Sequence, residues 1–188
     1  MSSGTAIPMF PAIIELNDIL LRKPIISDVS GIFNSYAQDI DVCRYLVWNP
    51  HKDQIDTMNY VQYCIDLWNS GKAPYVITHK GTDEIIGMID VRKLGTTIDI
   101  GYVLSREYWG RGIMSMVLSG VVDVVFDYEG IYRCQATCDV DNISSQRVLE
   151  KCGFSMEGRL ERYVVHPNIS LEPRAVFMYA KVKVISIK

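Results

Sequence analysis

A strongly apolar segment that follows a glycine turn constrains the fold more than any other part of the chain. Residues 113–126 read IMSMVLSGVVDVVF. Polar residues recur there at every fourth position, as Ser115, Ser119 and Asp123, and leave one narrow polar stripe. The valines would also suit a strand, but the length and the stripe favour a helix. We therefore expect a buried helix.

Strands and helices alternate around this segment. Residues 1–14 contain two prolines and are expected to form a loose lead-in to a single domain over residues 1–188. The order of elements predicts a mixed α/β (α+β) fold, with an antiparallel first half and a second half whose β-α-β-α-β order implies parallel pairing. We predict strands at 19–24, 74–80, 84–94, 97–104, 131–138, 154–165 and 174–184, with further helices at 27–39, 53–71 and 142–153.

Composition narrows the class of protein. Apolar residues make up 48% of the chain and charged residues 22%, which is too apolar for disorder. A net charge of -3 provides no basic surface for nucleic acid, so an amine or cationic substrate fits better. No window approaches the ~20 apolar residues of a membrane span, and the N-terminus lacks a secretion signal. We expect a cytoplasmic protein that binds neither nucleic acid nor membrane.

The cysteines argue against a disulfide framework. They are five in number and form no C-x-x-C pair. Cys134 and Cys138 could be metal ligands, but in a strand they share a face with Ala136 and are better explained as small core residues. No metal site is predicted.

Two glycines at the start of the apolar helix indicate a binding site for an anion. The first amides of a helix have no internal partner and carry partial positive charge. Gly110 and Gly112 would let a phosphate reach those amides, and Arg111 would add charge. The alternative is a sharp turn with a solvent-facing arginine. Because no G-K-[ST] and no third glycine at the dinucleotide spacing follow, coenzyme A is the remaining common diphosphate carrier.

Longer segments resemble the GNAT superfamily of acetyl-CoA-dependent N-acetyltransferases. They are IDIGYVLSREYWGRGIMSMVLSGVVDVVF, DVDNISSQRVLEKCGF and MEGRLERYVV. With DILLRKPIISD and WNPH, the chain resembles the Rim-type branch, which acetylates the α-amine of ribosomal proteins, over roughly residues 15–183. The resemblance implies the GNAT acyl-CoA N-acyltransferase fold, with a mixed central sheet of about seven strands flanked by about four helices.

The resemblance also implies the residues that bind acetyl-CoA. The amides from Tyr108 to Met114 would bind the pyrophosphate, and Val103 and Leu104 would pair with the pantetheine arm. Arg147 and Lys151 lie four residues apart, so a bound adenosine phosphate would relieve their repulsion, although a solvated surface is the alternative. The expected contacts are Val103, Leu104, Tyr108, Trp109, Gly110, Arg111, Gly112, Ile113, Met114, Asn142, Ser145, Arg147 and Lys151.

Asp99 is the expected general base. Strand alternation places Asp99, Gly101 and Val103 on one face of their strand, and the acidic residue of a similar stretch has this role in many GNAT enzymes. Aspartate is shorter than glutamate, which favours a relay through water. An ion pair with a nearby arginine, or a solubilising charge, is the alternative explanation.

Ser145 is the expected partner of the leaving thiolate, although it could be an ordinary first-turn serine behind the helix cap Asn142. The sequence departs from the family at two positions. Leu149 occupies the position at which many GNAT enzymes have a tyrosine that acts as general acid. Val164 lies near the position at which some Rim-type enzymes have a glutamate. The general acid is therefore open, with Ser145 as the candidate.

Tyr45, Trp48 and His51 lie in the connector that roofs the acceptor site in the family, although they could equally be a small core patch. A peptide or protein α-amine is the expected acceptor, with direct transfer because no cysteine has an activated setting. A small amine (polyamine, amino sugar or amino acid) and a sensor that binds acetyl-CoA without turnover are the alternatives. The chain is expected to be a monomer or a homodimer.

Overall fold

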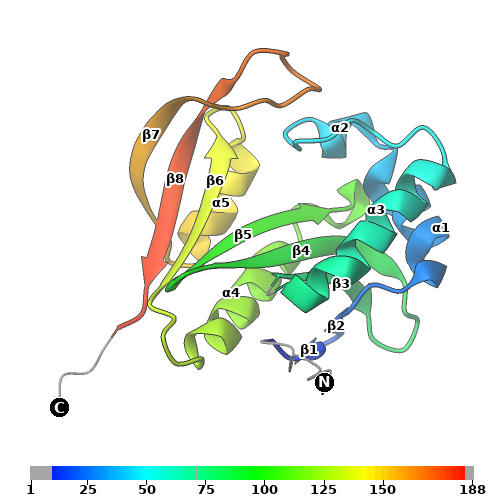
Figure 1. Ribbon diagram of the computed structural model, residues 1–188, viewed down its shortest axis with the longest axis horizontal. Helices are drawn as coiled ribbons and strands as arrows, with labels where there is room; N and C mark the ends of the chain where they lie inside the picture. Colours follow the sequence, from blue (N-terminus) through cyan, green and yellow to red (C-terminus); the bar gives the residue numbers. More distant parts are fainter. Residues whose placement is uncertain (1–9, 71, 185–188) are drawn as a thin grey trace, which may run out of the picture.

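The computed structural model describes residues 10–70 and 72–184, which form one eight-stranded sheet flanked by helices (Figure 1). The strands are β1 (Ile13–Leu16), β2 (Ile19–Arg22), β3 (Lys72–His79), β4 (Ile85–Leu94), β5 (Thr97–Leu104), β6 (Arg133–Asp139), β7 (Ser155–Val164) and β8 (Arg174–Val182). The α-helices are α1 (Val29–Ile32), α2 (Ile40–Cys43), α3 (Gln54–Leu67), α4 (Ile113–Phe126) and α5 (Ile143–Lys151). Short 3-10 or π turns are η1 (Ile26–Asp28), η2 (Phe33–Ala37), η3 (Trp68–Ser70) and η4 (Arg106–Tyr108).

The sheet is mixed, as the sequence predicts. Its strand order is β1-β2-β3-β4-β5-β6-β8-β7. The β5–β6 pair is parallel, and every other neighbouring pair is antiparallel. The expectation of parallel pairing after the second crossover is wrong, because β8 lies between β6 and β7 and pairs antiparallel with both.

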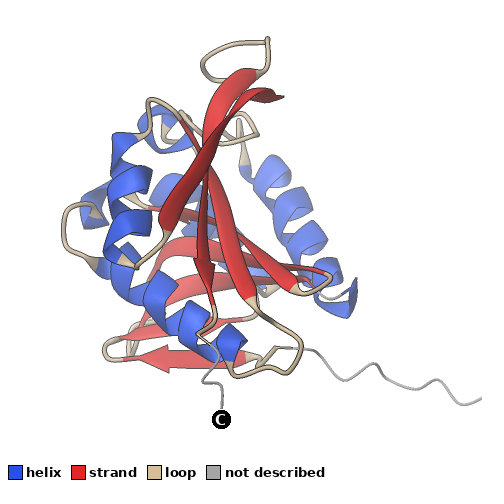
Figure 2. Ribbon diagram, turned by 90° about the vertical axis from the view of Figure 1, so that its left-hand side faces the viewer, coloured by secondary structure: helices blue, strands red, loops and turns tan. Residues whose placement is uncertain are grey.

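Helices cover both faces of the sheet (Figure 2). On one face α4 packs over the central strands, and its apolar side chains form the main core together with alternate residues of β5. This confirms residues 113–126 as a buried helix. On the other face α1 and α3 close a second core that includes Met88 and Val103. Ile98, Ile100 and Leu104 therefore face α4, whereas Val103 faces the opposite way.

The N-terminal segment differs from the expected lead-in. Residues 1–9 lie outside the described part, but Phe10 is buried and β1 begins at Ile13. Ile14 and Leu16 contact the main core, and Leu16 lies directly over Gly120 of α4. The expectation of a loose lead-in is therefore wrong for residues 10–14, because apolar side chains from this segment cover the helix.

The parallel pair β5–β6 separates after three residues. Thr97, Ile98 and Asp99 pair with Arg133, Cys134 and Gln135, and no further pairing follows. Beyond this point β5 stays paired with β4 as far as Leu104, while β6 stays paired with β8. The two strands diverge and leave facing edges with unpaired backbone groups.

Candidate active site

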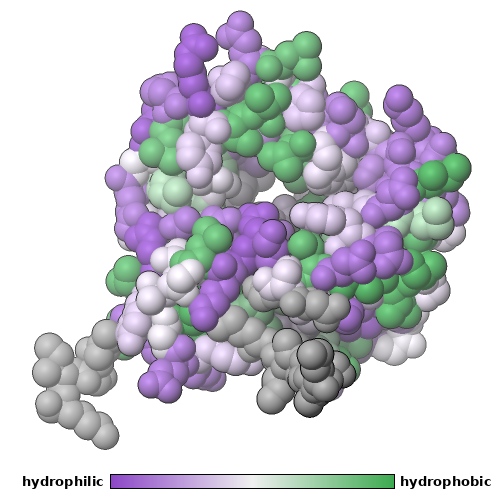
Figure 3. All heavy atoms as spheres, viewed as in Figure 1, coloured by the Kyte–Doolittle hydropathy of each residue, from purple (hydrophilic) through white to green (hydrophobic). Residues whose placement is uncertain are grey.

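A cavity of about 780 Å³ occupies the opening between β5 and β6. Its walls come from β4, β5 and β6, the start of α4, the length of α5, Tyr60 of α3, the segment from Asp41 to Trp48, the end of β7 and the start of β8. In the space-filling view the molecule is hollowed at its centre, and the hollow passes through to the far side (Figure 3). A ligand can therefore reach the centre from two directions.

The glycine turn lies at one end of this cavity. Gly110 and Gly112 have φ angles of 75° and 76°, in the left-handed region that favours glycine. Gly112 caps α4 without any side-chain hydrogen bond, so the first amides of the helix depend on an external acceptor. A Cβ built on either glycine would meet no atom of the described residues within 4 Å. The turn thus leaves open space directly at the positive end of a helix, which suits a diphosphate.

The neighbouring aromatic residues fix this turn. The Trp109 indole donates a hydrogen bond of 2.8 Å to the backbone oxygen of Leu104, and the Tyr108 hydroxyl donates one of 2.6 Å to Glu84. That bond to Glu84 raises the pKa of Tyr108 to about 12, so the hydroxyl stays protonated. The Cζ atom of Arg111 lies 5.3 Å from the centroid of the Tyr108 ring. Among the expected cofactor contacts, only Arg111 does not line the cavity.

Helix α5 forms the adjacent wall. Asn142 caps it by accepting a hydrogen bond from the Ser145 amide at 3.1 Å, which confirms the capping prediction. Arg147 and Lys151 both line the cavity. This basic edge and the open amides of α4 fit the phosphate groups of coenzyme A, and the unpaired edge of β5 fits its amide-bearing arm.

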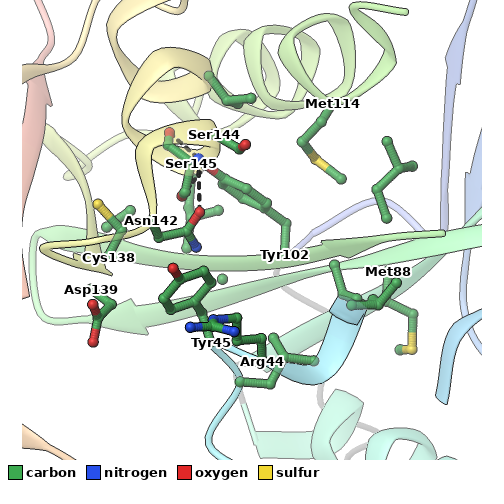
Figure 4. A pocket seen from close by; sticks show the side chains of 18 of the residues that line it. Arg44, Tyr45, Met88, Tyr102, Met114, Cys138, Asp139, Asn142, Ser144 and Ser145 are labelled. Atoms are coloured by element: carbon green, nitrogen blue, oxygen red, sulfur yellow. Dashed lines mark hydrogen bonds between the residues drawn. The ribbon is translucent and has the colours of Figure 1, made fainter. Parts of the chain in front are cut away.

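Tyr102 reaches from β5 to α5. Its hydroxyl lies 2.8 Å from that of Ser145, and Figure 4 shows the ring pointing from the strand toward the start of the helix. Burial raises the pKa of Tyr102 well above its usual value, so the phenol stays protonated. The chain therefore places a protonated phenol beside the serine expected near the thiolate.

Leu149 is completely buried in the main core. The position that carries a tyrosine in many GNAT enzymes here contributes only packing. Val164 lines the cavity, whereas the neighbouring Glu161 pairs with Arg159 at 2.8 Å and lies exposed.

Asp99 does not line the cavity. Arg92 holds its Oδ2 with two hydrogen bonds, of 2.6 and 3.1 Å, and Gln135 lies 3.4 Å from its Oδ1. The ion pair that the sequence left as an alternative is therefore present. The assignment of Asp99 as general base stays a prediction.

Two of the three expected acceptor residues line the cavity. Tyr45 and Trp48 line it, and the Tyr45 hydroxyl donates a hydrogen bond of 3.1 Å to the backbone oxygen of Asp141. In Figure 4, Tyr45 and Arg44 approach on the side opposite to Ser145. His51 instead packs behind Trp48 at 4.9 Å and hydrogen-bonds Thr57 at 2.9 Å, outside the lining.

Asp90, Arg92, Asp139 and His166 are among the polar cavity residues that the sequence did not predict. Asp139 is buried and bound by Arg174 at 2.6 Å, and His166 lies 3.7 Å from the same carboxylate. The two-residue turn at Gly95 and Thr96 sets the register of β4 against β5, and this register could have predicted the positions of Asp90 and Arg92. No comparable local signal predicts that β6 and the β7–β8 loop bring Asp139 and His166 together.

The five cysteines are buried and free. Burial raises the pKa of Cys43, Cys64, Cys134 and Cys138 to about 12, the opposite of an activated nucleophile. Cys134 and Cys138 lie in the core on either side of Ala136. Within residues 10–70 and 72–184 no group of three or more potential ligands could hold a metal ion, and no helix is long and apolar enough to cross a membrane.

Comparison with known proteins agrees with this geometry. Residues 18–155 match the model of the acetyltransferase (GNAT) domain. The chain is 31% identical over 160 residues to the uncharacterized N-acetyltransferase YoaA of Bacillus subtilis (strain 168), covering 83% of this chain and 89% of that protein. It is 33% identical over 110 residues to the ribosomal-protein-serine acetyltransferase of Escherichia coli (strain K12), covering 57% and 61%.

A solved structure of RimL, the ribosomal L7/L12 alpha-N-protein acetyltransferase, in complex with coenzyme A has a TM-score of 0.78 and 26% identity, covering 90% of this chain and 97% of that one. The chain belongs to the GNAT family of acetyltransferases and resembles its Rim-type members. It is an acetyl-CoA-dependent N-acetyltransferase.

Proposed function

We propose that this enzyme acetylates the α-amine of a protein or peptide N-terminus, by direct transfer from acetyl-CoA in a ternary complex. The observation that carries the proposal is a cavity that opens on two faces and is lined both by the glycine turn and by the segment from Asp41 to Trp48. Two entrances allow both substrates to be bound at once. An open passage also accommodates the chain that follows an N-terminal residue.

The charged residues that line the acceptor side of the cavity favour an acceptor with one amine nitrogen over an acceptor with several. Of its three aspartates, Asp41 is bound by Arg106 at 2.7 Å and Asp139 by Arg174 at 2.6 Å. Only Asp90 keeps a buried carboxylate oxygen without a partner among the described residues. A polyamine that lay wholly inside the cavity would need an anionic or aromatic partner for each of its cationic nitrogens, whereas an N-terminal amine needs such a partner for one.

The cofactor residues are proposed on the same basis. The amides of residues 110–114 would bind the diphosphate, and Arg147 and Lys151 would bind the phosphate of the adenosine part. The thioester would supply the acetyl group, and its sulfur would leave toward Ser145 and Tyr102. Apart from Arg111, each of these residues lines the cavity.

The test is a panel of acceptors, with release of free thiol as the measurement. Octapeptides that begin with serine, alanine or methionine are compared with their N-acetylated forms, and with spermidine and glucosamine. The proposal predicts turnover of free peptides at least about 100-fold above both small amines, since peptide contacts beyond the amine add binding energy. Preferred acetylation of spermidine would contradict it. Tight binding of acetyl-CoA without any turnover would indicate a sensor.

A further inference from the structure

We propose that Asp90, and not Asp99, is the carboxylate that binds the ammonium group of the acceptor and takes its proton. The inference deepens the proposed function and rests on it, because it assumes an amine acceptor. Asp90 lies on β4 and lines the cavity. It has the free acceptor atom that a base needs.

The hydrogen bonds of Asp90 are incomplete. Its Oδ2 accepts one bond of 2.9 Å from Arg92. Its Oδ1 is buried and has no hydrogen-bond partner among the described residues. A buried carboxylate oxygen without a donor costs several kcal/mol unless a ligand supplies one. An ammonium group bound in the cavity would supply the missing donor and a compensating charge.

Arg92 distinguishes the two aspartates. It gives two hydrogen bonds to Asp99 and one to Asp90. Its guanidinium lies over Gly101, where a Cβ would come within 3.4 Å of Nη2. Gly101 is the residue directly opposite Asp90 on β5, so the missing side chain makes room for this bridge. Asp99 thus holds Arg92 in place, and Asp90 faces the cavity.

Aromatic rings in the same cavity add a second kind of group that can bind a cation. Trp48 and Tyr60 line the same cavity, with their ring centroids 5.9 Å apart. An ammonium group is stabilised by a carboxylate and by the faces of aromatic rings. The combination of Asp90 with these two rings is therefore chemically suited to an amine.

The groups around Asp90 set its proton affinity. They are Arg92 on the same strand, Asp99 on β5, Lys72 on β3, and Tyr60 and Cys64 on α3. Burial is the largest influence and raises the pKa of Asp90 above 3.8, Asp99 raises it further, and Arg92 and Lys72 oppose the rise. A raised pKa brings this carboxylate closer to the working range of a general base.

The proton balance is complete. The acceptor R–NH3+ transfers one proton to Asp90 and becomes a neutral amine. Its nitrogen then forms a bond to the acetyl carbon as the carbon–sulfur bond breaks. The second proton of the nitrogen goes to the departing thiolate, which yields the free thiol. Asp90 finally returns its proton to water.

Three variants test the assignment in the full-length protein: Asp90→Asn, Asp90→Glu and Asp99→Asn. With the serine octapeptide as acceptor, Asp90→Asn should lower kcat/KM about 100-fold and remove the acid limb of the pH profile. Asp90→Glu should retain more of kcat/KM than Asp90→Asn does, and its acid limb should lie at a different pH. Asp99→Asn should lower the rate much less and retain the limb. The opposite order of losses would assign the base to Asp99 and overturn the proposal.

Binding without turnover provides an independent readout. Each variant is saturated with coenzyme A, whose unchanged affinity shows an intact fold, and is titrated with the serine octapeptide or its N-acetylated form. Asp90→Asn should weaken binding of the free-amine peptide about tenfold and leave the acetylated peptide unaffected, because only the former carries a charge. Equal effects on both would overturn the proposal. Acetylation of spermidine alone would refute the peptide acceptor, and the same variants would then be compared with spermidine.

Discussion

The hydroxyl groups of Tyr102 and Ser145 lie 2.8 Å apart, and this contact joins β5 to the first turn of α5 across the wall of the cavity. Burial raises the pKa of Tyr102, so the phenol remains protonated at neutral pH. Because Leu149 is buried and cannot ionise, we take these two hydroxyls as the candidates for the acid that many GNAT enzymes have as a tyrosine on this helix.

We predict that Ser145→Ala and Tyr102→Phe each lower kcat about 10- to 100-fold, because each removes a donor near the leaving thiolate. The losses should not add, since the two groups act as one unit. Steady-state thiol release by the single and double variants measures this coupling. Ser144→Ala is the matched control, because Ser144 lines the same cavity without this contact. Fully additive losses would contradict a joint role.

The glycine turn gives a second prediction. Gly112→Ala should weaken binding of acetyl-CoA at least about tenfold, because its Cβ enters the open space at the start of α4 and closes the approach to the amides. Gly95→Ala is the control: Gly95 also has a positive φ, of 63°, and open space around it, but it lies in the β4–β5 turn. Both variants should lose about 1 kcal/mol of unfolding free energy. Calorimetric titration with acetyl-CoA separates them, and equal affinities would contradict the site.

The buried ion pair between Asp139 and Arg174 gives a third prediction. Burial alone would raise the pKa of Asp139, but hydrogen bonds from Arg174 and the Asp141 amide lower it below 3.8. Its contribution to the free energy of unfolding is therefore present above pH 3.8 and is lost as the pH falls through the lowered value. Asp139→Asn should cost about 3 kcal/mol at pH 7, because it leaves Arg174 without its buried partner.

Asp141→Asn is the control for that experiment. Asp141 also pairs with Arg174, at 2.7 Å, but its side chain is 68% exposed, so the loss should stay below about 1 kcal/mol. Urea unfolding of both variants at pH 7 measures the difference. Comparable losses would show that the buried contact is not the stabilising one.

Direct transfer predicts that no cysteine carries the acetyl group. Cys138 is the cysteine that lines the cavity within the described residues, and burial raises the pKa of its thiol to about 12. Cys138→Ala should therefore retain kcat within about threefold, since the thiol is not a nucleophile at neutral pH. Mass spectrometry after mixing with acetyl-CoA alone should find unmodified protein. An acetylated peptide containing Cys138 would refute direct transfer.

The sequence predicted those parts of the site that depend on local geometry. Gly112 caps a helix in a conformation that only glycine adopts readily, and Asn142 accepts a hydrogen bond within its own turn. Both features lie within a few residues of chain, so they can be read from the order of residue types.

Other parts depend on strand register or on distant contacts. The two-residue turn at Gly95 places Arg92 opposite Asp99 and Asp90 opposite Gly101, so the ion pair was in principle predictable from that turn. The insertion of β8 between β6 and β7 was not predictable in this way, because the connection through helix α5 would allow either β7 or β8 to pair with β6. The approach of His166 to Asp139 follows from that insertion.

A crystal structure of the complex with coenzyme A is the most direct test of the binding mode. The diphosphate should accept hydrogen bonds from the amides of residues 110–114, with the pantetheine arm in the opening between β5 and β6. A diphosphate bound at any other place on the molecule, with these amides facing solvent, would contradict it.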